Sequence, residues 1–371
     1  IYNFVSGDET SGAHSIARAT LETGFGNTLV DGAVYTMTIS ATDAASNAAT
    51  PVSNTGIAYL NTAPIISFVT PASNSTINAV FSANYTLSKA VSLGTITFTQ
   101  TSGTADANSH IYNLVSGDET SGAHSIARAT LETGFGNTLV SGAVYTMTIS
   151  ATDAAANVST PVSNTGIAYL NTAPVISSVT PATSSSVNAA FSANYTLSES
   201  VTSGTVTFAR TSGTVDALPH TYTFATGDKT SGAHSVTRTV LETGFGNTLV
   251  SGAVYTMTVS ATDAASNVAT PVSSTGITYD NVSPTVTLST PLNPTSASPF
   301  TVTATFSEVV TGVTITDYTV VGGTTSNFVP VNGTTYRVDV TPTTGSITIN
   351  MASHIALDIA GNGNTAANQL D

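Results

Sequence analysis

The chain has 371 residues, no cysteine, no tryptophan and a formal net charge of −14, from 7 Lys and Arg against 21 Asp and Glu. Without cysteine neither disulfides nor thiolate metal sites are available, and so acidic a chain makes nucleic acid and anionic lipid poor candidate partners. No apolar run approaches the roughly 18 residues of a membrane span, so we expect no direct membrane insertion.

The sequence repeats itself with a period of 110 residues. Ile1-Tyr2-Asn3 returns as Ile111-Tyr112-Asn113 and, more loosely, as Thr221-Tyr222-Thr223. Residues 1–61 differ from residues 111–171 at five positions. A period of this length suits one small domain repeated in tandem. Any functional feature of one copy is therefore present two or three times, which points to a property of an array rather than to one catalytic centre.

Turns and strands follow one another along each copy. Clusters of glycine and asparagine at residues 6–8, 24–27 and 31–32 predict turns. Residues 35–41 then alternate apolar and polar side chains, and residues 81–88 do the same. Such alternation predicts half-buried antiparallel strands, and threonine and valine suit a pleated surface. We expect no amphipathic helix longer than a turn or two.

The linkers indicate where each domain begins. Asn61-Thr62-Ala63-Pro64 recurs as Asn171-Thr172-Ala173-Pro174 and, changed, as Asn281-Val282-Ser283-Pro284, each time before an apolar strand. Proline at a first strand, where one edge is free, is a natural domain start.

This phasing predicts four segments. Residues 1–61 are the C-terminal half of one repeat, residues 62–171 and 172–281 are complete repeats, and residues 282–371 are a divergent domain that lacks its last strand. We expect each complete repeat to be an all-β sandwich of about seven antiparallel strands, in an elongated array. Both ends look cut, so we expect a segment of a longer protein.

Residues 29–43 resemble the late strand of fibronectin type III and bacterial immunoglobulin-like repeats. Tyr35 matches the tyrosine that closes a strand corner in those families, with Met37 as its buried neighbour, and the pair recurs one and two periods later. Asp43-Ala44-Ala45-Ser46-Asn47 resembles the Asp-x-Ala-Gly-Asn turn of bacterial surface repeats. Residues 300–308 and 358–364 resemble another bacterial immunoglobulin-like repeat. The tryptophan of immunoglobulin and fibronectin cores is missing, so the resemblance is to the bacterial group and implies tandem immunoglobulin-like sandwiches.

A turn with aspartate and asparagine four residues apart recurs in every copy. Its side chains offer oxygen ligands for calcium near a domain boundary. Calcium needs six or more oxygens, usually with several carboxylates, whereas each turn offers one, so an Asx-type turn that bonds its own backbone stays the alternative. The calcium candidates are Asp43, Asn47, Asp153, Asn157, Asp263, Asn267, Asp280, Asp358 and Asn362.

Histidine, serine and arginine also recur together, first as His14, Ser15 and Arg18. The even spacing places His14 and Arg18 on one face of a strand and Ser15 on the other, so no hydrolase triad is assembled. No sequence resembles a nucleophile elbow. We expect structural histidines, arginines that pair with Glu22 or its equivalents, no catalytic residue and no enzyme. The acidic pair Asp8-Glu9 indicates a solvated loop.

These observations favour a structural, extracellular repeat protein of the bacterial cell surface, as a stalk or as a subunit of a filament, sheath or adhesin. The expected partners are copies of the chain itself or neighbouring repeats of a longer chain. The alternative is an adhesive binding module that recognises a glycan, ice or another surface ligand, or that calcium makes rigid.

Overall fold

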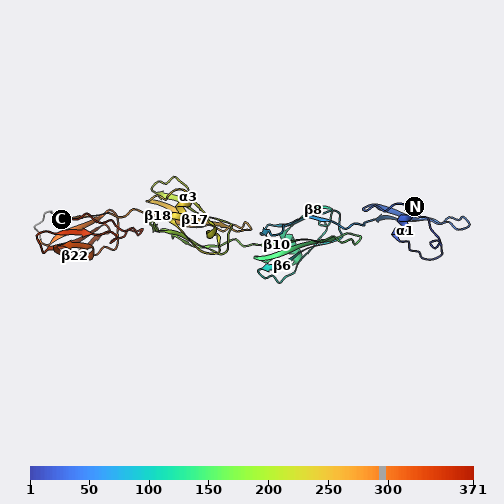
Figure 1. The fold of residues 1–371 in the computed structure, drawn as a ribbon, viewed down its shortest axis with the longest axis horizontal. Coiled ribbons are helices and arrows are strands. Elements are labelled where there is room, and N and C mark those ends of the chain that lie inside the picture. Colours follow the sequence, from blue (N-terminus) through green and yellow to red (C-terminus); the bar gives the residue numbers. More distant parts are fainter. Residues whose placement is uncertain (292–297) are drawn as a thin grey trace. The chain divides into compact units, whose positions relative to one another are not determined.

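The computed structural model describes residues 1–291 and 298–371, which form two compact units, residues 1–172 and residues 173–371. Strands dominate the regular structure of both units (Figure 1). In the part of the chain that is described, no helix has the length and the hydropathy that a membrane crossing requires.

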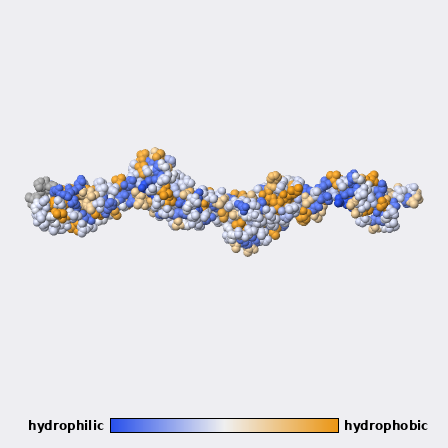
Figure 2. Space-filling model, in the orientation of Figure 1, coloured by the Kyte–Doolittle hydropathy of each residue, from blue (hydrophilic) through white to orange (hydrophobic). Residues whose placement is uncertain are grey.

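Residues 1–61, which we call copy 1, contain helix α1 (Arg18–Phe25) and one antiparallel pair, β1 (Val34–Ile39) with β2 (Val52–Ala58). The apolar side chains of this pair are open to solvent. Met37 is 45% exposed, whereas Met147, one period later, is fully buried. Figure 2 shows hydrophobic side chains at the surface of this N-terminal part, at the right of the view.

Residues 62–171, repeat 2, form two sheets. The smaller sheet has strand order β3-β5-β8 and the larger has order β4-β10-β9-β6-β7, in which only β4 and β10 pair in parallel. The strands are β3 (Ile66–Thr70), β4 (Thr76–Ile77), β5 (Ser82–Leu87), β6 (Leu93–Gly103), β7 (His110–Asn113), β8 (Gly122–Ala127), β9 (Ala143–Thr152) and β10 (Val162–Tyr169).

The two sheets of repeat 2 enclose one apolar core. Every second residue of β9 is buried, as the alternation of apolar and polar side chains predicts. Tyr85 and Leu87 from the smaller sheet share the core with Ile96, Tyr145 and Met147 from the larger one. Apolar area removed from water contributes roughly 25 cal/mol per Å², so each repeat that closes such a core gains stability of its own.

Helix α2 (Arg128–Phe135) joins β8 to β9. Arg128 forms an ion pair with Glu132 one turn later, as expected, and Leu131 is buried beneath the helix. Gly136 ends the helix with φ 73°, a left-handed conformation that glycine adopts without steric cost. The prediction that His124 and Arg128 share one strand is wrong, because β8 ends before Arg128 and the arginine begins the helix.

Residues 172–281, repeat 3, have the same arrangement, with sheets β11-β13-β16 and β12-β18-β17-β14-β15 around a second core. The elements are β11 (Ile176–Thr180), β12 (Ser186–Val187), β13 (Ser192–Leu197), β14 (Ser203–Gly213), β15 (His220–Thr223), η1 (Thr226–Lys229), β16 (Gly232–Thr237), α3 (Arg238–Phe245), β17 (Ala253–Thr262) and β18 (Val272–Tyr279).

Residues 282–371, the C-terminal repeat, contain sheets β19-β20-β23-β22 and β21-β24 around a third core. The elements are β19 (Val286–Ser289), β20 (Phe300–Phe306), η2 (Ile315–Asp317), β21 (Tyr318–Val321), β22 (Gly323–Asn332), β23 (Thr335–Pro342) and β24 (Thr348–Met351). Two-sheet sandwiches in tandem confirm the predicted all-β, immunoglobulin-like fold class. The segment boundaries 1–61, 62–171, 172–281 and 282–371 stay predictions.

Candidate functional site

The recurring Asp–Asn turn is built from its own hydrogen bonds. In repeat 2, Asp153 Oδ1 accepts from the backbone N–H groups of Ala155 and Asn157, both at 3.0 Å. The Asn157 side-chain amide donates back to both oxygens of the Asp153 carboxylate. Asp153 is 1% exposed. The carboxylate therefore holds the turn that follows β9, as an Asx-type turn does.

Burial and hydrogen bonding act in opposite directions on the pKa of Asp153. Burial raises it, but the side-chain and backbone hydrogen bonds of Asn157, the backbone N–H of Ala155 and the charge of Lys89 together lower it below its ordinary value. The folded chain thus keeps a charged carboxylate at this buried position.

The asparagine of the turn also reaches the linker of the preceding repeat. Asn157 Nδ2 donates to the carbonyl oxygen of Leu60 at 3.1 Å. In the second unit, Asn362 Nδ2 donates in the same way to the carbonyl oxygen of Asp280 at 2.9 Å, while it also holds Asp358. The turn is therefore part of a junction between consecutive repeats within each unit.

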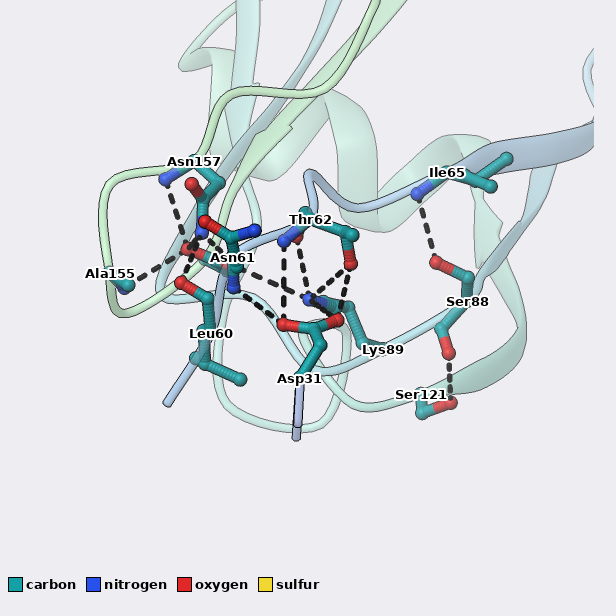
Figure 3. A network of polar contacts seen from close by, with 11 residues as sticks. Asp31, Leu60, Asn61, Thr62, Ile65, Ser88, Lys89, Ser121, Ala155 and Asn157 are labelled. Carbon is teal, nitrogen blue, oxygen red and sulfur yellow. Dashed lines mark hydrogen bonds and ion pairs between the residues drawn. The ribbon is translucent and has the colours of Figure 1, made fainter. Parts of the chain in front are cut away.

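A lysine ammonium group lies between two carboxylates at the junction of copy 1 and repeat 2 (Figure 3). Lys89 Nζ lies 3.5 Å from Asp153 Oδ2 and 3.6 Å from Asp31 Oδ2 of copy 1, and it donates to the carbonyl oxygen of Thr62 at 2.6 Å. Asp31 accepts further hydrogen bonds from Thr62 Oγ1 and from the backbone N–H of Asn61, both at 2.5 Å. These hydrogen bonds lower the pKa of Asp31 to about 2, and the Thr62 hydroxyl contributes more than the backbone N–H of Asn61.

Three carboxylates meet at the corresponding junction of the second unit. Oxygen atoms of Asp280, Glu308 and Asp358 all lie within 4.8 Å of one another. Glu308 follows Phe306-Ser307 as Lys89 follows Leu87-Ser88, so an acid stands here where repeat 2 has its lysine. Burial, and then the charges of Asp280 and Asp358, raise the pKa of Glu308.

The chemistry of this group fits a hard cation. Three carboxylates carry three negative charges, and calcium takes oxygen ligands, of which carboxylates are the most common charged kind. Asp280 Oδ1 already accepts from Ser251 Oγ and from the backbone N–H of Val282, which fixes its orientation. Asp280, Glu308 and Asp358 would hold the ion.

The other calcium candidates lie each in their own turn. Asp43 accepts from Asn47 and Ala45 and is exposed. Asp263 accepts from Asn267 in the same way and is buried. The pKa of Glu199 is raised, first by the burial of Glu199 and then by the negative charge of Asp263. Sequence reasoning missed Glu308 and Glu199. Each glutamate follows an apolar strand residue and a serine, as Lys89 does in repeat 2. An alignment of the repeats at this serine would have found both glutamates.

The recurring histidine has a structural place. His124 Nε2 lies 2.8 Å from the carbonyl oxygen of Thr120, and its ring stacks on Tyr85 at 5.0 Å between centroids. Arg128 donates to the carbonyl oxygen of Ala79 as well as pairing with Glu132. These contacts give His124 and Arg128 a structural role in repeat 2.

A second polar cluster, which sequence reasoning missed, lies inside repeat 2. Asp106 Oδ2 accepts from Tyr145 Oη at 2.5 Å and lies 2.6 Å from His110 Nε2. Burial raises the pKa of Asp106, but the hydrogen bonds from Tyr145 and His110 outweigh it and bring the pKa down to about 2. The side chains of Asp106 and His110 are closed to solvent. The spacing Asp-x-x-x-His, which returns at Asp216 and His220, is its sequence signal.

Tyr145 also closes the strand corner that the family resemblance predicts. Its hydroxyl accepts from the backbone N–H of Val140 at 2.9 Å, and Tyr255 does the same for Val250 in repeat 3. Met147 is fully buried beside it.

Residues 280–371 match the family model described as Bacterial Ig-like domain. This confirms the resemblance of the C-terminal repeat to bacterial immunoglobulin-like domains. A search of the curated proteins gives no match.

Among solved structures, a tetra-tandem repeat from the extending region of a large adhesion protein is 21% identical, with 92% of this chain and 82% of that chain covered and a TM-score of 0.31. FdeC, an Escherichia coli adhesin, is 12% identical, with 82% and 96% covered and a TM-score of 0.32. Fibronectin(III)-like modules of Clostridium thermocellum CbhA are 14% identical, with 58% and 94% covered and a TM-score of 0.26. Because these TM-scores lie below 0.5, the fold assignment stands on the sheets of this chain and on the family match.

Proposed function

We propose that the chain is a spacer: a stalk or filament segment of a bacterial cell-surface protein of the adhesin type, without enzymatic activity. The observation that carries this proposal is the set of three separate apolar cores, one each for residues 66–169, 176–279 and 286–356. Repeats that close their own cores add length without sharing a catalytic centre, and their stabilities sum with those of nearest-neighbour contacts.

The junction contacts support the mechanical part of this proposal. Within the first unit, the Thr62 hydroxyl of repeat 2 donates to Asp31 of copy 1, and the Asn157 amide of repeat 2 donates to the carbonyl oxygen of Leu60 of copy 1. Such contacts restrict bending at a short linker, while the cores resist unfolding one at a time.

Small-angle scattering and force spectroscopy of the whole chain test the spacer proposal. We expect a rod-like scattering profile and successive unfolding steps of similar contour length, one for each complete repeat. A compact globular profile, or a single unfolding step for the whole chain, contradicts the proposal.

The open face of copy 1 supports the proposed partner, which is another repeat of the same kind from a longer chain or a second copy. Met37, Ile39 and Ile57 are 40–47% exposed, whereas Met147, Ile149 and Ile167, one period later, are fully buried by their own sheets. Analytical ultracentrifugation of the chain tests association through this face. A Met37→Asp substitution weakens self-association in that case, and a Met147→Asp substitution unfolds repeat 2 instead.

The carboxylate group of Asp280, Glu308 and Asp358 favours a second candidate, an adhesive module that calcium makes rigid. Burial and then the charges of Asp280 and Asp358 raise the pKa of Glu308, and a bound cation offsets both effects. A ligand that binds only the folded state at 100 times its Kd adds about 2.7 kcal/mol to stability. We expect millimolar calcium to raise the melting temperature of the second unit.

Exchanging the two junction residues provides the control. Glu308→Lys supplies an internal ammonium, as Lys89 does in the first unit, so this variant is expected to be more stable without calcium and insensitive to added calcium. Lys89→Glu is expected to make the first unit sensitive to calcium. Absence of any calcium-dependent shift in the wild-type chain rules out this candidate.

A further inference from the structure

Phe68 occupies a position where neither packing nor backbone preference favours an aromatic residue. Its side chain is 82% exposed, and its φ of 52° lies in the left-handed region, which is strained for a bulky side chain. The residue stands in β3, where the ladder to β5 shifts register between Ser67 and Thr70. An irregularity of this kind redirects a side chain out of the regular pleat.

Repeat 3 shows that the fold does not require an aromatic residue here. Ser178 takes the place of Phe68 with the same backbone conformation, φ 53°, and the ladder of β11 shifts in the same way. A small residue therefore satisfies the backbone. The phenylalanine of repeat 2 is an addition to a surface that forms without it.

Phe68 is one wall of a shallow hollow of about 360 Å³ on the smaller sheet. The floor and the other walls come from β5 and β8, whose residues face one another in register. Asn84 Nδ2 donates to Thr70 Oγ1 at 2.7 Å, which fixes the amide beside Phe68, whereas the ring of His124 stacks on the buried Tyr85 on the other face of the sheet. The residues beside Phe68 are Asn84, Tyr85, Thr86, Ala123, His124 and Ser125.

The exposed surface of the hollow is mostly apolar, and its lining carries no carboxylate, lysine or arginine, in a chain whose net charge is −14. The Thr86 and Ser125 hydroxyls form no hydrogen bond with any residue in the described part of the chain, so both are open to a ligand. An exposed aromatic face beside an amide and two free hydroxyls suits a neutral ligand with an apolar face and a polar rim. A pyranose ring has both features, since its C–H face stacks on an aromatic ring while its hydroxyls form hydrogen bonds.

We infer that this hollow of repeat 2 is a binding site for a neutral saccharide, with Phe68 as the stacking platform and Asn84, Thr86 and Ser125 as hydrogen-bonding groups. This site goes beyond the spacer role and does not depend on it. Repeat 3 lacks the site, because Ser178 stands where repeat 2 has the aromatic ring of Phe68. The other six equivalent residues are identical in the two repeats. They are Asn194, Tyr195, Thr196, Ala233, His234 and Ser235.

Reciprocal substitutions in the whole chain test the inference. The probes are neutral oligosaccharides of glucose, xylose, mannose and galactose, and the measurement is isothermal titration calorimetry. A site this shallow is expected to bind with a Kd on the order of 1 mM at a stoichiometry of one. Phe68→Ser should weaken binding at least tenfold, and Ser178→Phe should raise the stoichiometry to two. Phe68→Ser should not lower the melting temperature, because serine occurs naturally in this backbone, and Ser178→Phe should still fold, because phenylalanine occupies the same backbone conformation in repeat 2.

Two further variants separate stacking from general apolar contact. Phe68→Trp should bind at least as tightly as wild type, and Phe68→Leu should bind at least fivefold more weakly although it keeps an apolar side chain. Failure of the wild-type chain to bind any of the neutral sugars overturns the inference. Equal binding by the leucine variant, or a preference for an apolar peptide over every sugar, overturns it as well.

Discussion

Lys89 Nζ lies 3.5 Å from the carboxylate of Asp153, whose side chain has no exposed surface. The same ammonium group lies 3.6 Å from Asp31, which belongs to copy 1. Glu308 stands in the corresponding place of the C-terminal repeat and faces Asp358 instead. One residue position therefore decides whether a junction carries its own cation.

Removal of the lysine charge should weaken the first unit. Lys89→Met leaves the buried Asp153 carboxylate without its cation, and because the lysine is partly exposed we expect a loss of about 1–2 kcal/mol rather than the larger cost of breaking a fully buried pair. Urea unfolding of the chain, together with amide exchange at Asn61 and Thr62, measures it. Lys229→Met removes a lysine elsewhere and is the matched control; equal effects of the two variants would contradict the prediction.

The two junctions should respond to pH in opposite directions. The pKa of Asp31 is lowered to about 2, so its contribution is present above the unfolded pKa of about 4 and is lost as pH falls toward 2. The pKa of Glu308 is raised, so its folded state binds the proton more tightly. Stability from Glu308 is therefore greatest below the unfolded pKa and falls as pH rises through the raised value.

Glu308→Gln isolates the second effect. With calcium chelated, we expect this variant to be more stable than wild type at pH 7 and similar to it below about pH 4, measured by the melting temperature of the second unit. Glu9→Gln, in the exposed loop of copy 1, should change neither value. A glutamine variant less stable than wild type at pH 7 would refute the argument.

The strand-corner tyrosine offers a matched pair of substitutions. Tyr145→Phe leaves the backbone N–H of Val140 without its partner and removes one of the hydrogen bonds that the buried Asp106 carboxylate accepts, so we expect repeat 2 to lose about 2–3 kcal/mol. Tyr35 bonds Val30 in the same way, but at an exposed site where water replaces the hydroxyl. Tyr35→Phe should therefore cost less than about 0.5 kcal/mol. Urea unfolding measures both, and equal losses would show that burial does not decide the effect.

Gly103 should tolerate no side chain. It has φ 78°, and a Cβ atom there would collide with the backbone carbonyl oxygen of Gly142, which cannot move aside. We expect Gly103→Ala to cost about 3 kcal/mol or more. Gly117 also has a positive φ, 108°, but its surroundings are open, so Gly117→Ala should cost only about 1 kcal/mol. Similar melting temperatures for the two alanine variants would argue against a collision at Gly103.

Much of the fold could be predicted because it depends on local patterns. The alternation along residues 143–152 sets which face of β9 is buried, and the resemblance around Tyr145 located the strand corner. The turn at Asp153 and Asn157 follows from two side chains four residues apart. Each of these features is decided by neighbours within a few positions in the sequence.

The parts that could not be predicted depend on contacts between distant segments. Tyr145 reaches Asp106 from 39 positions away, and Glu308 joins Asp280 and Asp358 only after the strands pair. Arg128 was expected on a strand, because Gly134 and Gly136 indicated only a turn. In the structure Gly134 lies inside α2 against the ring of Tyr112, and Gly136 ends that helix.

The register shift between β3 and β5 affects how consecutive, nearly identical repeats fold while the chain is being synthesised. β3 is an outer strand of its sheet, and the side-chain amide of Asn164 donates to the carbonyl oxygens of Val69 and Pro71, next to the irregular position. These carbonyl groups are thus already satisfied, and the backbone between them departs from the regular spacing that an incoming strand would need. While successive copies emerge from the ribosome at high local concentration, this edge discourages one copy from exchanging strands with the next.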